Sequence, residues 1–425
     1  MQFNWLRSLL NLGRWLWKML ALPVLVGVSI GILTGTSSAV LLATLDLATA
    51  WRESHLWILW LLPLGGLLSG LIYHYWGNSV VAGNNLILCE IHDPQTIIPL
   101  QMAPLVLLGT TIAHLFGASV GREGTAVQMG AALADRLTQI YRCSGLDRRI
   151  VLMAGISGGF ASVFGTPLAG MVFGLEVLTV GTLRYKGLFP CAIAAIVGDR
   201  VTLAWGLHHQ VYQIPIVPEM TLWGLLVSII SGGIFGLTAR LFVTLTHQIA
   251  AYFQAKISYP PFRPFVGGIL VAIAVRVLST TKYIGLGIPT IVSAFNTQLP
   301  PWDFAAKIAF TALSLGAGFK GGEVTPLFYI GATLGNALAP LTILPAPLLA
   351  GMGFVGVFAG AANTPLASTL MAIELFGSPT ASYAGIACIC SYLCSGNVGI
   401  YRAQRVGMSK DASLEPHTDK PGDDA

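Results

Sequence analysis

Charged residues are scarce in this sequence. Only 10% of its 425 residues are Asp, Glu, Lys or Arg, compared with about 25% in ordinary soluble domains. The net charge of +5 is spread along the chain, which argues against nucleic acid as a partner. The apolar fraction is 54% and the mean hydropathy is +0.73. We therefore predict an all-α polytopic membrane protein surrounded by lipid.

Cysteine is also scarce, and the pattern of its residues argues against a disulfide framework. The six cysteines are Cys89, Cys143, Cys191, Cys388, Cys390 and Cys394. The last three form a C-x-C-x3-C pattern that could suggest a metal, but no His or carboxylate lies close to them in the sequence. We expect small membrane-buried thiols here, and neither a metal nor another cofactor.

A secretory signal is absent as well. Residues 1–18 contain no long uncharged core and no small-residue cleavage site. Their polar residues Arg7, Asn11, Arg14 and Lys18 fall on one helical face, which predicts an amphipathic helix on the cytoplasmic membrane surface. An ordinary cytoplasmic lead-in remains open as the alternative.

The chain is rich in long apolar segments. Residues 19–47 and 56–75 are each long enough to cross a bilayer, which takes about 20 helical residues. The polar stretches predict a first membrane repeat at 19–208, a connection at 209–220, a second membrane repeat at 221–407 and a polar cytoplasmic tail at 408–425. The tail is polar and mostly acidic, so we expect it to be disordered.

Basic residues flank the apolar region at both ends. They are Arg7, Arg14 and Lys18 before it, and Arg402, Arg405 and Lys410 after it. The positive-inside rule therefore places both termini in the cytoplasm, and residues 136–149 are a third cytoplasmic candidate. We expect a multi-pass protein of a bacterial inner (plasma) membrane.

Residues 117–130, GASVGREGTAVQMG, place an ionisable pair next to an apolar run at 97–116. Arg122 and Glu123 lie between Gly121 and Gly124. Charged groups at membrane depth are costly, so such a pair indicates a functional site facing a cavity. The glycines permit a broken helix, and a helix beginning near Thr125 would direct its free N–H groups and positive dipole end at an anion.

The sequence contains an internal repeat. Thr-Pro-Leu-Ala at 166–169 recurs at 364–367, and Glu176 recurs as Glu374 at the same offset of 198 residues. The pattern of Gly121, Glu123 and Thr125 recurs, 200 residues later, at 321, 323 and 325. Two half-chains with interrupted helices predict a transporter-like fold with its site at the midplane between the repeats.

Glu123 can act as a switch at such a site. Its ionised carboxylate is itself an anion and can occupy the dipole-lined position, whereas the protonated form loses that attraction and leaves the position to a substrate anion. Competition between carboxylate and anion would couple proton and anion movements in opposite directions. The alternative is an Arg122–Glu123 pair that only fixes packing.

These motifs resemble the anion-binding segments of the CLC chloride channel and transporter family. The similar segments are GREGTAVQMG at 121–130, GGEVTPLFYIGATLG at 321–335, GTPLAGMVFGLE at 165–176 and the late tyrosine Tyr401 in GIYRAQR. The resemblance implies a CLC-type fold of two inverted halves with broken helices meeting at a midplane anion site. It also implies a homodimer and Glu123 as the gating glutamate.

The departures from the common family pattern are informative. The first motif usually reads GSGIP, but Asn84 stands here in place of the serine; Thr125 replaces a proline, and Glu323 alters the third motif. This combination resembles the fluoride-exporting, proton-coupled branch. Val177 stands where chloride/proton exchangers have a second glutamate, which puts the usual internal proton relay in doubt and makes Glu323 a hypothetical replacement.

We therefore predict a proton-coupled fluoride antiporter with Glu123 and Glu323 as gating and proton groups. The predicted anion-binding residues are Gly83, Asn84, Asn85, Gly121, Arg122, Gly124, Thr125, Gly322, Val324, Thr325 and Tyr401. For Asn84 and Asn85 the segment itself leaves two roles open, and helix capping is favoured over lining a polar cavity.

Other functions remain to be distinguished. The nearest is a chloride channel or chloride/proton exchanger on the same scaffold, followed by a passive fluoride channel. An intramembrane serine hydrolase would use Ser119, which lies in a G-x-S-x-G pattern close to His114. That pattern is short and needs a strand–turn–helix context. We expect instead that the G-x-S-x-G pattern consists of small residues at a helix break and that His114 is a packing residue with its hydrogen bonds satisfied. We therefore expect no enzyme activity.

Overall fold

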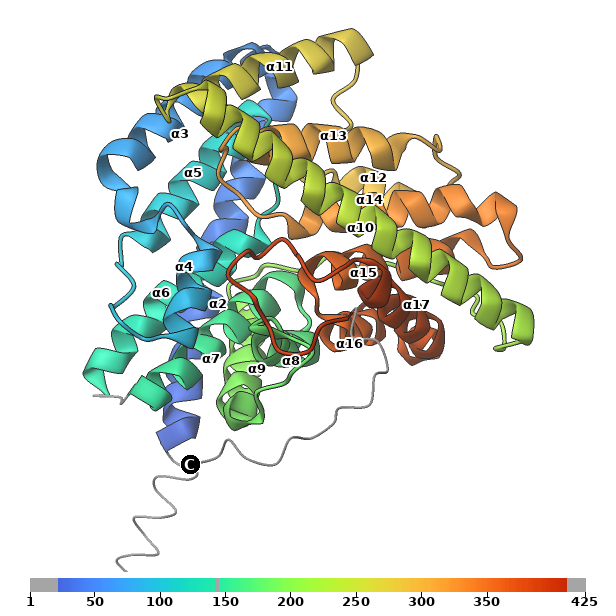
Figure 1. Cartoon of the computed structure of the whole chain (residues 1–425), viewed down its shortest axis with the longest axis horizontal. Coiled ribbons are helices and arrows are strands. Elements are labelled where there is room, and N and C mark those ends of the chain that lie inside the picture. The colour runs from blue at the N-terminus through green and yellow to red at the C-terminus, as the bar shows by residue number, and fades with distance from the viewer. Residues whose placement is uncertain (1–21, 142–144, 411–425) are drawn as a thin grey trace, which may run out of the picture.

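The computed structural model describes residues 22–141 and 145–410 (Figure 1). The predicted amphipathic helix at 1–18 and most of the predicted tail, residues 411–425, lie outside the described residues. The described chain is mostly helical with almost no sheet, which confirms the all-α prediction. Its two strands, β1 (Thr179–Val180) and β2 (Arg405–Val406), have two residues each and pair in parallel.

The helices fall into two sets separated by the residues between 204 and 222. The first set is α2 (Leu22–Ser54), α3 (Leu62–Trp76), α4 (Asn84–His92), α5 (Met102–Phe116), α6 (Glu123–Ile140), α7 (Gly145–Phe164), α8 (Pro167–Glu176) and α9 (Leu188–Ala204). The second set is α10 (Leu222–Lys256), α11 (Phe262–Leu278), α12 (Ile288–Ala294), α13 (Asp303–Gly316), α14 (Val324–Leu338), α15 (Ala346–Ala362), α16 (Pro365–Phe376) and α17 (Ala381–Cys394).

Helix length divides the elements into spanning and interrupted ones. In the part of the chain that the structure describes, five segments are long and apolar enough to cross a membrane, namely Leu22–Ser54, Leu56–Trp76, Tyr185–Ala204, Leu222–Lys256 and Val324–Leu341. Others, such as α5 and α8, are apolar but shorter. Irregular backbone at membrane depth is tolerated only where protein or a water-filled space surrounds it. The ends of the short helices are therefore the places to look for a site.

The two halves are joined by a reciprocal pair of carboxylates. Glu176, the last residue of α8, accepts hydrogen bonds from the backbone N–H groups of Leu366 and Ala367 at the start of α16, at 3.0 and 2.8 Å. Glu374 in α16 accepts the equivalent bonds from residues 168 and 169 at the start of α8, at 2.8 and 2.9 Å. Every partner is displaced by the repeat offset of 198, which is the relation that an approximate two-fold axis produces.

Proline begins both of the helices that take part in this exchange. Pro167 and Pro365 stand at the first position of α8 and α16, where the missing N–H would have had no partner inside the helix. The next two N–H groups stay free to donate to the carboxylate from the other half. A carboxylate at a helix N-terminus is also favoured by the helix dipole. The repeated motif thus fastens one half-chain to the other.

Glycine brings α14 and α15 into backbone contact. A Cβ atom at Gly331 would lie 2.0 Å from the carbonyl oxygen of Gly353, and one at Gly335 would lie 2.0 Å from that of Leu349. Such small-residue faces are typical of helix packing in membranes, where close approach maximises dispersion contacts. This contact fixes α14, and with it the position of the N-terminus that faces the site.

The C-terminal strap, residues 397–410, lies beside α15 (Figure 1). The Ile400 N–H donates to the Ala361 carbonyl at 2.9 Å, and β2 pairs with β1. Gln404 donates through Nε2 to the carbonyls of Val177 and Ala362 at 2.9 and 3.1 Å. These bonds hold the strap against both halves and bury Tyr401 in the interior.

Candidate anion site

Two loops, one from each half, meet at their glycines. The Gly121 N–H donates to the Gly322 carbonyl at 2.6 Å, and the Gly322 N–H donates to the Gly121 carbonyl at 2.7 Å. The pair lies immediately before α6 and α14. Because the loops bond in this antiparallel way, the N-termini of the two helices are brought together at one place.

The approach requires residues without side chains. A Cβ atom at Gly322 would lie 2.8 Å from the backbone nitrogen of Gly124, and one at Gly124 would lie 3.2 Å from the Gly322 Cα and 3.1 Å from the Asn84 amide nitrogen. The contacts between Gly322 and Gly124 are with backbone atoms, which no rotamer change can move away, whereas the contact with Asn84 is with a side chain. Gly124 and Gly322 therefore allow three chain segments to approach one another, namely those that carry Gly124, Gly322 and Asn84.

The Glu123 carboxylate lies on the N-terminus of the helix from the other half. Its Oε2 accepts from the Thr325 N–H at 3.1 Å and from the Arg122 N–H at 3.2 Å. The Thr325 hydroxyl donates to Oε1. Glu123 is only 1% exposed. A buried carboxylate held by a helix N-terminus occupies the kind of position that binds an anion.

Arg122 contributes charge but no hydrogen bond to this carboxylate from its side chain. Its Nε lies 3.7 Å from Glu123 Oε1, and the same Nε has no hydrogen-bond partner among the described residues. The bonds that hold the carboxylate thus come from backbone and from α14, which does not favour the packing-pair alternative. α6 begins at Glu123, two residues before the expected start at Thr125, and the Thr125 hydroxyl pairs with that of Thr110 at 2.7 Å.

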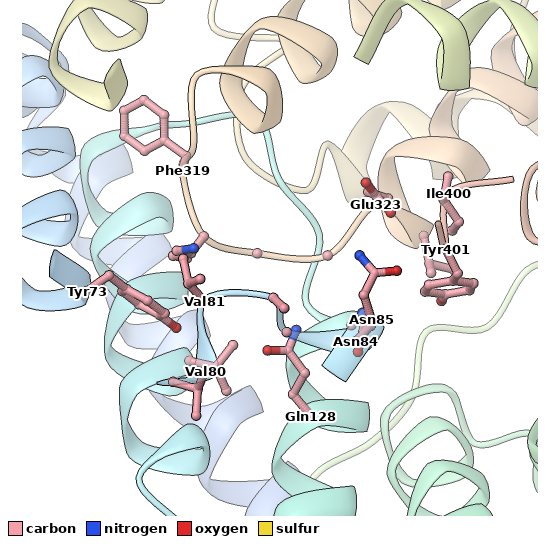
Figure 2. A pocket seen from close by; sticks show the side chains of 18 residues that line it. Tyr73, Val80, Val81, Asn84, Asn85, Gln128, Phe319, Glu323, Ile400 and Tyr401 are labelled. Atoms are coloured by element: carbon pink, nitrogen blue, oxygen red, sulfur yellow. The ribbon is translucent and has the colours of Figure 1, made fainter. Parts of the chain in front are cut away.

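A cavity of about 180 Å³ lies beside the meeting point (Figure 2). Eight of the predicted residues line it: Gly83, Asn84, Asn85, Gly124, Gly322, Glu323, Val324 and Tyr401. Four others of the predicted set, Gly121, Arg122, Thr125 and Thr325, are absent from the lining and contact Glu123 or its neighbours. The predicted residues therefore divide into a cavity and a carboxylate site directly behind it.

The asparagines line the cavity and do not cap α4, so the favoured capping role is wrong. The N-cap residue is Gly83, whose positive φ of 55° turns the chain so that Asn84 already lies inside the helix, and no side chain makes a cap bond. Asn84 Oδ1 is buried without a partner among the described residues. Asn85 Oδ1 accepts from the Ala403 N–H at 3.0 Å, which ties α4 to the C-terminal strap.

Tyr401 and Val177 line a second, much smaller cavity that also touches Asn84. The Tyr401 ring packs edge-on to Phe173 with centroids 6.5 Å apart. A small cavity of about 10 Å³ is lined by Asn84, Val177 and Tyr401 together with apolar side chains. The described residues that line this small cavity include no carboxylate that could take the place of the glutamate missing at Val177. Among the described residues that line the main cavity, the carboxylate is instead that of Glu323, at the start of α14.

The residues suspected of hydrolase chemistry do not form a catalytic pair. The Ser119 hydroxyl hydrogen-bonds to that of Thr311 at 2.8 Å. His114 is fully buried, and among the described residues no hydrogen bond joins it to Ser119, so the serine has no base beside it. Among the described cysteines, Cys191 and Cys388 are buried whereas Cys89 and Cys394 are exposed on the helix surface.

Sequence reasoning missed part of the cavity lining. Tyr73, Gln128, Phe319 and Lys320 also line it. Lys320 had a usable signal, because it is an ionisable residue inside an apolar segment next to a glycine pair. The other three side chains come from elements far apart in the sequence, and no local pattern brings them together.

Broken helices that pair at a buried carboxylate define a membrane transport protein of the repeat type. The particular family follows from the sequence match, since the voltage gated chloride channel family covers residues 65–396. The chain belongs to this family, the CLC family, whose members are channels and transporters.

Individual relatives agree with this assignment. A chloride/fluoride channel protein of Pseudomonas syringae pv. tomato is 59% identical over 407 residues, which cover 94% of this chain and 89% of that protein. A solved CLC-type fluoride/proton antiporter is 32% identical with a TM-score of 0.89 and covers 92% of this chain and 99% of its own. A cyanobacterial Cl⁻/H⁺ antiporter shares the fold, with a TM-score of 0.78 over 88% of this chain and 94% of its own at 18% identity.

Proposed function

We propose that the protein is a proton-coupled antiporter that exports fluoride across a bacterial inner membrane. The observation that carries the proposal is the Glu123 carboxylate on the N-terminus of α14, bonded to the Thr325 N–H and hydroxyl. The ionised carboxylate occupies the anion position. A proton neutralises it, weakens its attraction to the helix dipole and frees the position for fluoride.

Antiport follows from this competition. The anion and the ionised carboxylate use the same donors, so fluoride binds when Glu123 has taken up a proton. When fluoride leaves toward one side, the carboxylate returns and releases its proton toward the other. No covalent chemistry is involved, and we propose that the protein has no enzymatic activity.

Fluoride as the substrate is supported by two considerations. The Pseudomonas relative is described as a chloride/fluoride channel protein and the solved relative as a fluoride/proton antiporter. Fluoride is small and strongly hydrated, so its dehydration needs strong hydrogen-bond donors. The Asn84 amide, the Thr325 hydroxyl and the Tyr401 phenol supply donors of this kind. A chloride channel or chloride/proton exchanger is the alternative function.

Flux measurements in liposomes test the proposal. The purified protein is reconstituted, and efflux of fluoride and of chloride is followed with a pH probe inside the vesicles. Fluoride efflux with proton movement in the opposite direction and little chloride flux is the expected result. Rapid chloride flux would return the protein to the chloride-transporting alternative, and fluoride flux without protons would make it a passive channel.

Asn84→Ser is expected to shift ion preference toward chloride. The substitution removes an amide that points into the cavity beside α6 and shortens the side chain, which weakens the donor set for a small anion and leaves room for a larger one. The fluoride-to-chloride flux ratio measures the effect, and we expect it to fall about tenfold, which corresponds to roughly 1.4 kcal/mol of discrimination. Asn85→Ser is the comparison: Asn85 also lines the cavity, but its Oδ1 already accepts from the Ala403 N–H, so the ratio should change less in this variant. An unchanged ratio in Asn84→Ser would remove Asn84 from selectivity.

Glu323→Gln is expected to slow proton transport strongly while leaving the anion site assembled. We propose that Glu323 replaces the glutamate that Val177 lacks, because its side chain faces the cavity from the start of α14. Gln has nearly the same shape but cannot take up a proton. Proton flux measured with the internal pH probe reports the change. Normal proton coupling in this variant would leave Glu323 a structural role.

Assembly and orientation complete the proposal. We propose a homodimer with both termini in the cytoplasm, a first repeat at 19–208, a connection at 209–220 and a second repeat at 221–407, with a polar tail from 408. The reciprocal bonds of Glu176 and Glu374 support this division. Light scattering in detergent and accessibility of a terminal tag from the cytoplasmic side test the two statements separately.

A further inference from the structure

Lys320 is a cation on the cavity wall that the anion site described above does not use. It belongs to the segment just before α14 and lines the cavity together with Asn84 and Glu323. Its Nζ lies 4.1 Å from the centroid of the Tyr73 ring. In the part of the chain that the structure describes, it forms no ion pair with a carboxylate. A lysine in a membrane segment without an acidic partner usually serves a substrate pathway.

The stem of Lys320 packs closely against a neighbouring helix, whereas its charged end makes a weaker contact. A Cβ atom at Gly109 of α5 would lie 2.9 Å from the Lys320 Cβ and 3.1 Å from its Cγ, so this part of the side chain packs on the helix. The ammonium lies over an aromatic ring. Such a cation–π contact is weaker than an ion pair with a desolvated anion. An anion entering the cavity can therefore displace the ring.

The cavity carries charges of opposite sign at its two ends. Among its described lining residues, Lys320 is the cation and Glu323 is the carboxylate. Figure 2 shows Tyr73 and Val81 on one side of the cavity and Glu323 with Tyr401 on the other. Val81, which lines the cavity at the end where Tyr73 holds Lys320, is 55% exposed, so this end of the cavity lies next to the protein surface.

We propose that Lys320 is an anion-recruiting residue: its ammonium leaves the Tyr73 ring, pairs with the incoming anion at the mouth of the cavity and passes it to Asn84 and the paired helix N-termini. The proton uses the Glu323 end of the same cavity. Separate ends keep the two ions from neutralising each other before each reaches its own group. The identity of the anion as fluoride rests on the proposed function; the recruitment step needs only an anion.

A charge-neutral variant of Lys320 tests the proposal. In liposomes, Lys320→Met is expected to raise the half-saturating fluoride concentration about five- to tenfold and to flatten its dependence on ionic strength, as loss of a steering charge does. The number of protons moved per fluoride should not change, because Glu123 and Glu323 remain. Lys320→Arg keeps the charge and should restore both the concentration and the salt dependence.

The Tyr73 ring provides an independent readout. Tyr73→Phe keeps the ring and should behave like the unchanged protein. Tyr73→Leu removes the competitor for the ammonium and should lower the half-saturating concentration. A purely packing role for Lys320 would instead leave half-saturation and salt dependence unchanged in Lys320→Met, which would overturn the proposal. If the unchanged protein carries chloride instead of fluoride, the proposed function fails, and the same variants measured with chloride still decide the role of Lys320.

Discussion

Glu123→Gln is expected to abolish proton coupling. Proton movement driven by a fluoride gradient should fall to the level of protein-free liposomes, whereas the protein should remain folded. Gln has the shape of a protonated glutamate, so it fits the same space beside Thr325. It cannot ionise, and its neutral amide has no charge to be attracted by the positive ends of α6 and α14. The cycle then lacks the step that exchanges a proton for an anion.

The control for this variant is Arg122→Gln. If Glu123 and Arg122 form only a packing pair, the two substitutions should have similar consequences, because each removes one partner. If Glu123 is the gate, Arg122→Gln should retain coupling, since the Arg122 guanidinium makes no hydrogen bond to the carboxylate and lies 3.7 Å from it. Internal pH and fluoride efflux recorded on the same vesicles distinguish the outcomes. Coupled exchange that survives in Glu123→Gln would contradict the gating role.

Much of the architecture could be predicted from the sequence because the repeat is visible in it. Matching Thr-Pro-Leu-Ala motifs and matching glutamates located the equivalent segments of the two halves. The sequence did not reveal that Glu176 bonds to α16 and Glu374 to α8. A repeat offset says which residues are equivalent, but only the relative orientation of the halves says which residues touch.

The parts of the site that depend on backbone conformation and on contacts between distant loops were harder to predict from the sequence. Asn is a residue type that commonly caps helices, so the sequence favours a capping role for Asn84. In the structure Gly83 occupies the cap position with φ of 55°, and the Asn84 side chain faces the cavity instead. Similarly, the pairing of Gly121 with Gly322 is a tertiary contact between loops about 200 residues apart. Propensity describes a local segment, whereas these features follow from how distant segments meet.

Arg148 illustrates the same limit for a charged residue. In the sequence it belongs to a basic stretch that marks a cytoplasmic loop. In the structure its guanidinium binds Asp135 with two bonds, from Nε at 2.7 Å and Nη2 at 2.8 Å, and Glu90 from Nη1 at 2.9 Å. A third partner is the Thr96 carbonyl, at 2.6 Å from Nη2. The residue therefore links α4, α6 and α7, a role that charge counting could not show.

The carboxylates of this network are themselves fully engaged. Asp135 Oδ2 accepts from the Ile98 N–H at 2.7 Å, and Glu90 accepts from the N–H and hydroxyl of Thr96. The side chains of Arg148, Glu90 and Asp135 are 10%, 7% and 0% exposed. Removal of the cation would leave two buried negative charges without their counter-charge. Burial of unpaired charge is among the most costly changes a folded protein can suffer.

Arg148→Met is accordingly expected to destabilise the protein by about 3–5 kcal/mol, the range for breaking a buried ion pair from one side. Methionine keeps much of the volume, so the loss reports charge and not a cavity. Thermal unfolding of the purified protein in detergent measures it as a lowered midpoint. Arg136→Met is the matched control. Arg136 lies on α6 next to Asp135 and is exposed, and among the described residues its side chain bonds to the exposed Gln139 at 3.0 Å. Its change should therefore stay within about 0.5 kcal/mol.

The second arm of that experiment separates charge from shape. Adding Glu90→Gln and Asp135→Asn to Arg148→Met removes the stranded charges along with the cation, and the triple variant should recover part of the lost stability. Recovery would show that the cost lies in uncompensated charge. Equal stability of Arg148→Met and Arg136→Met would instead contradict a buried network. Since α4 carries Asn84 at its start and Glu90 near its end, the network also holds the helix that presents an amide to the anion.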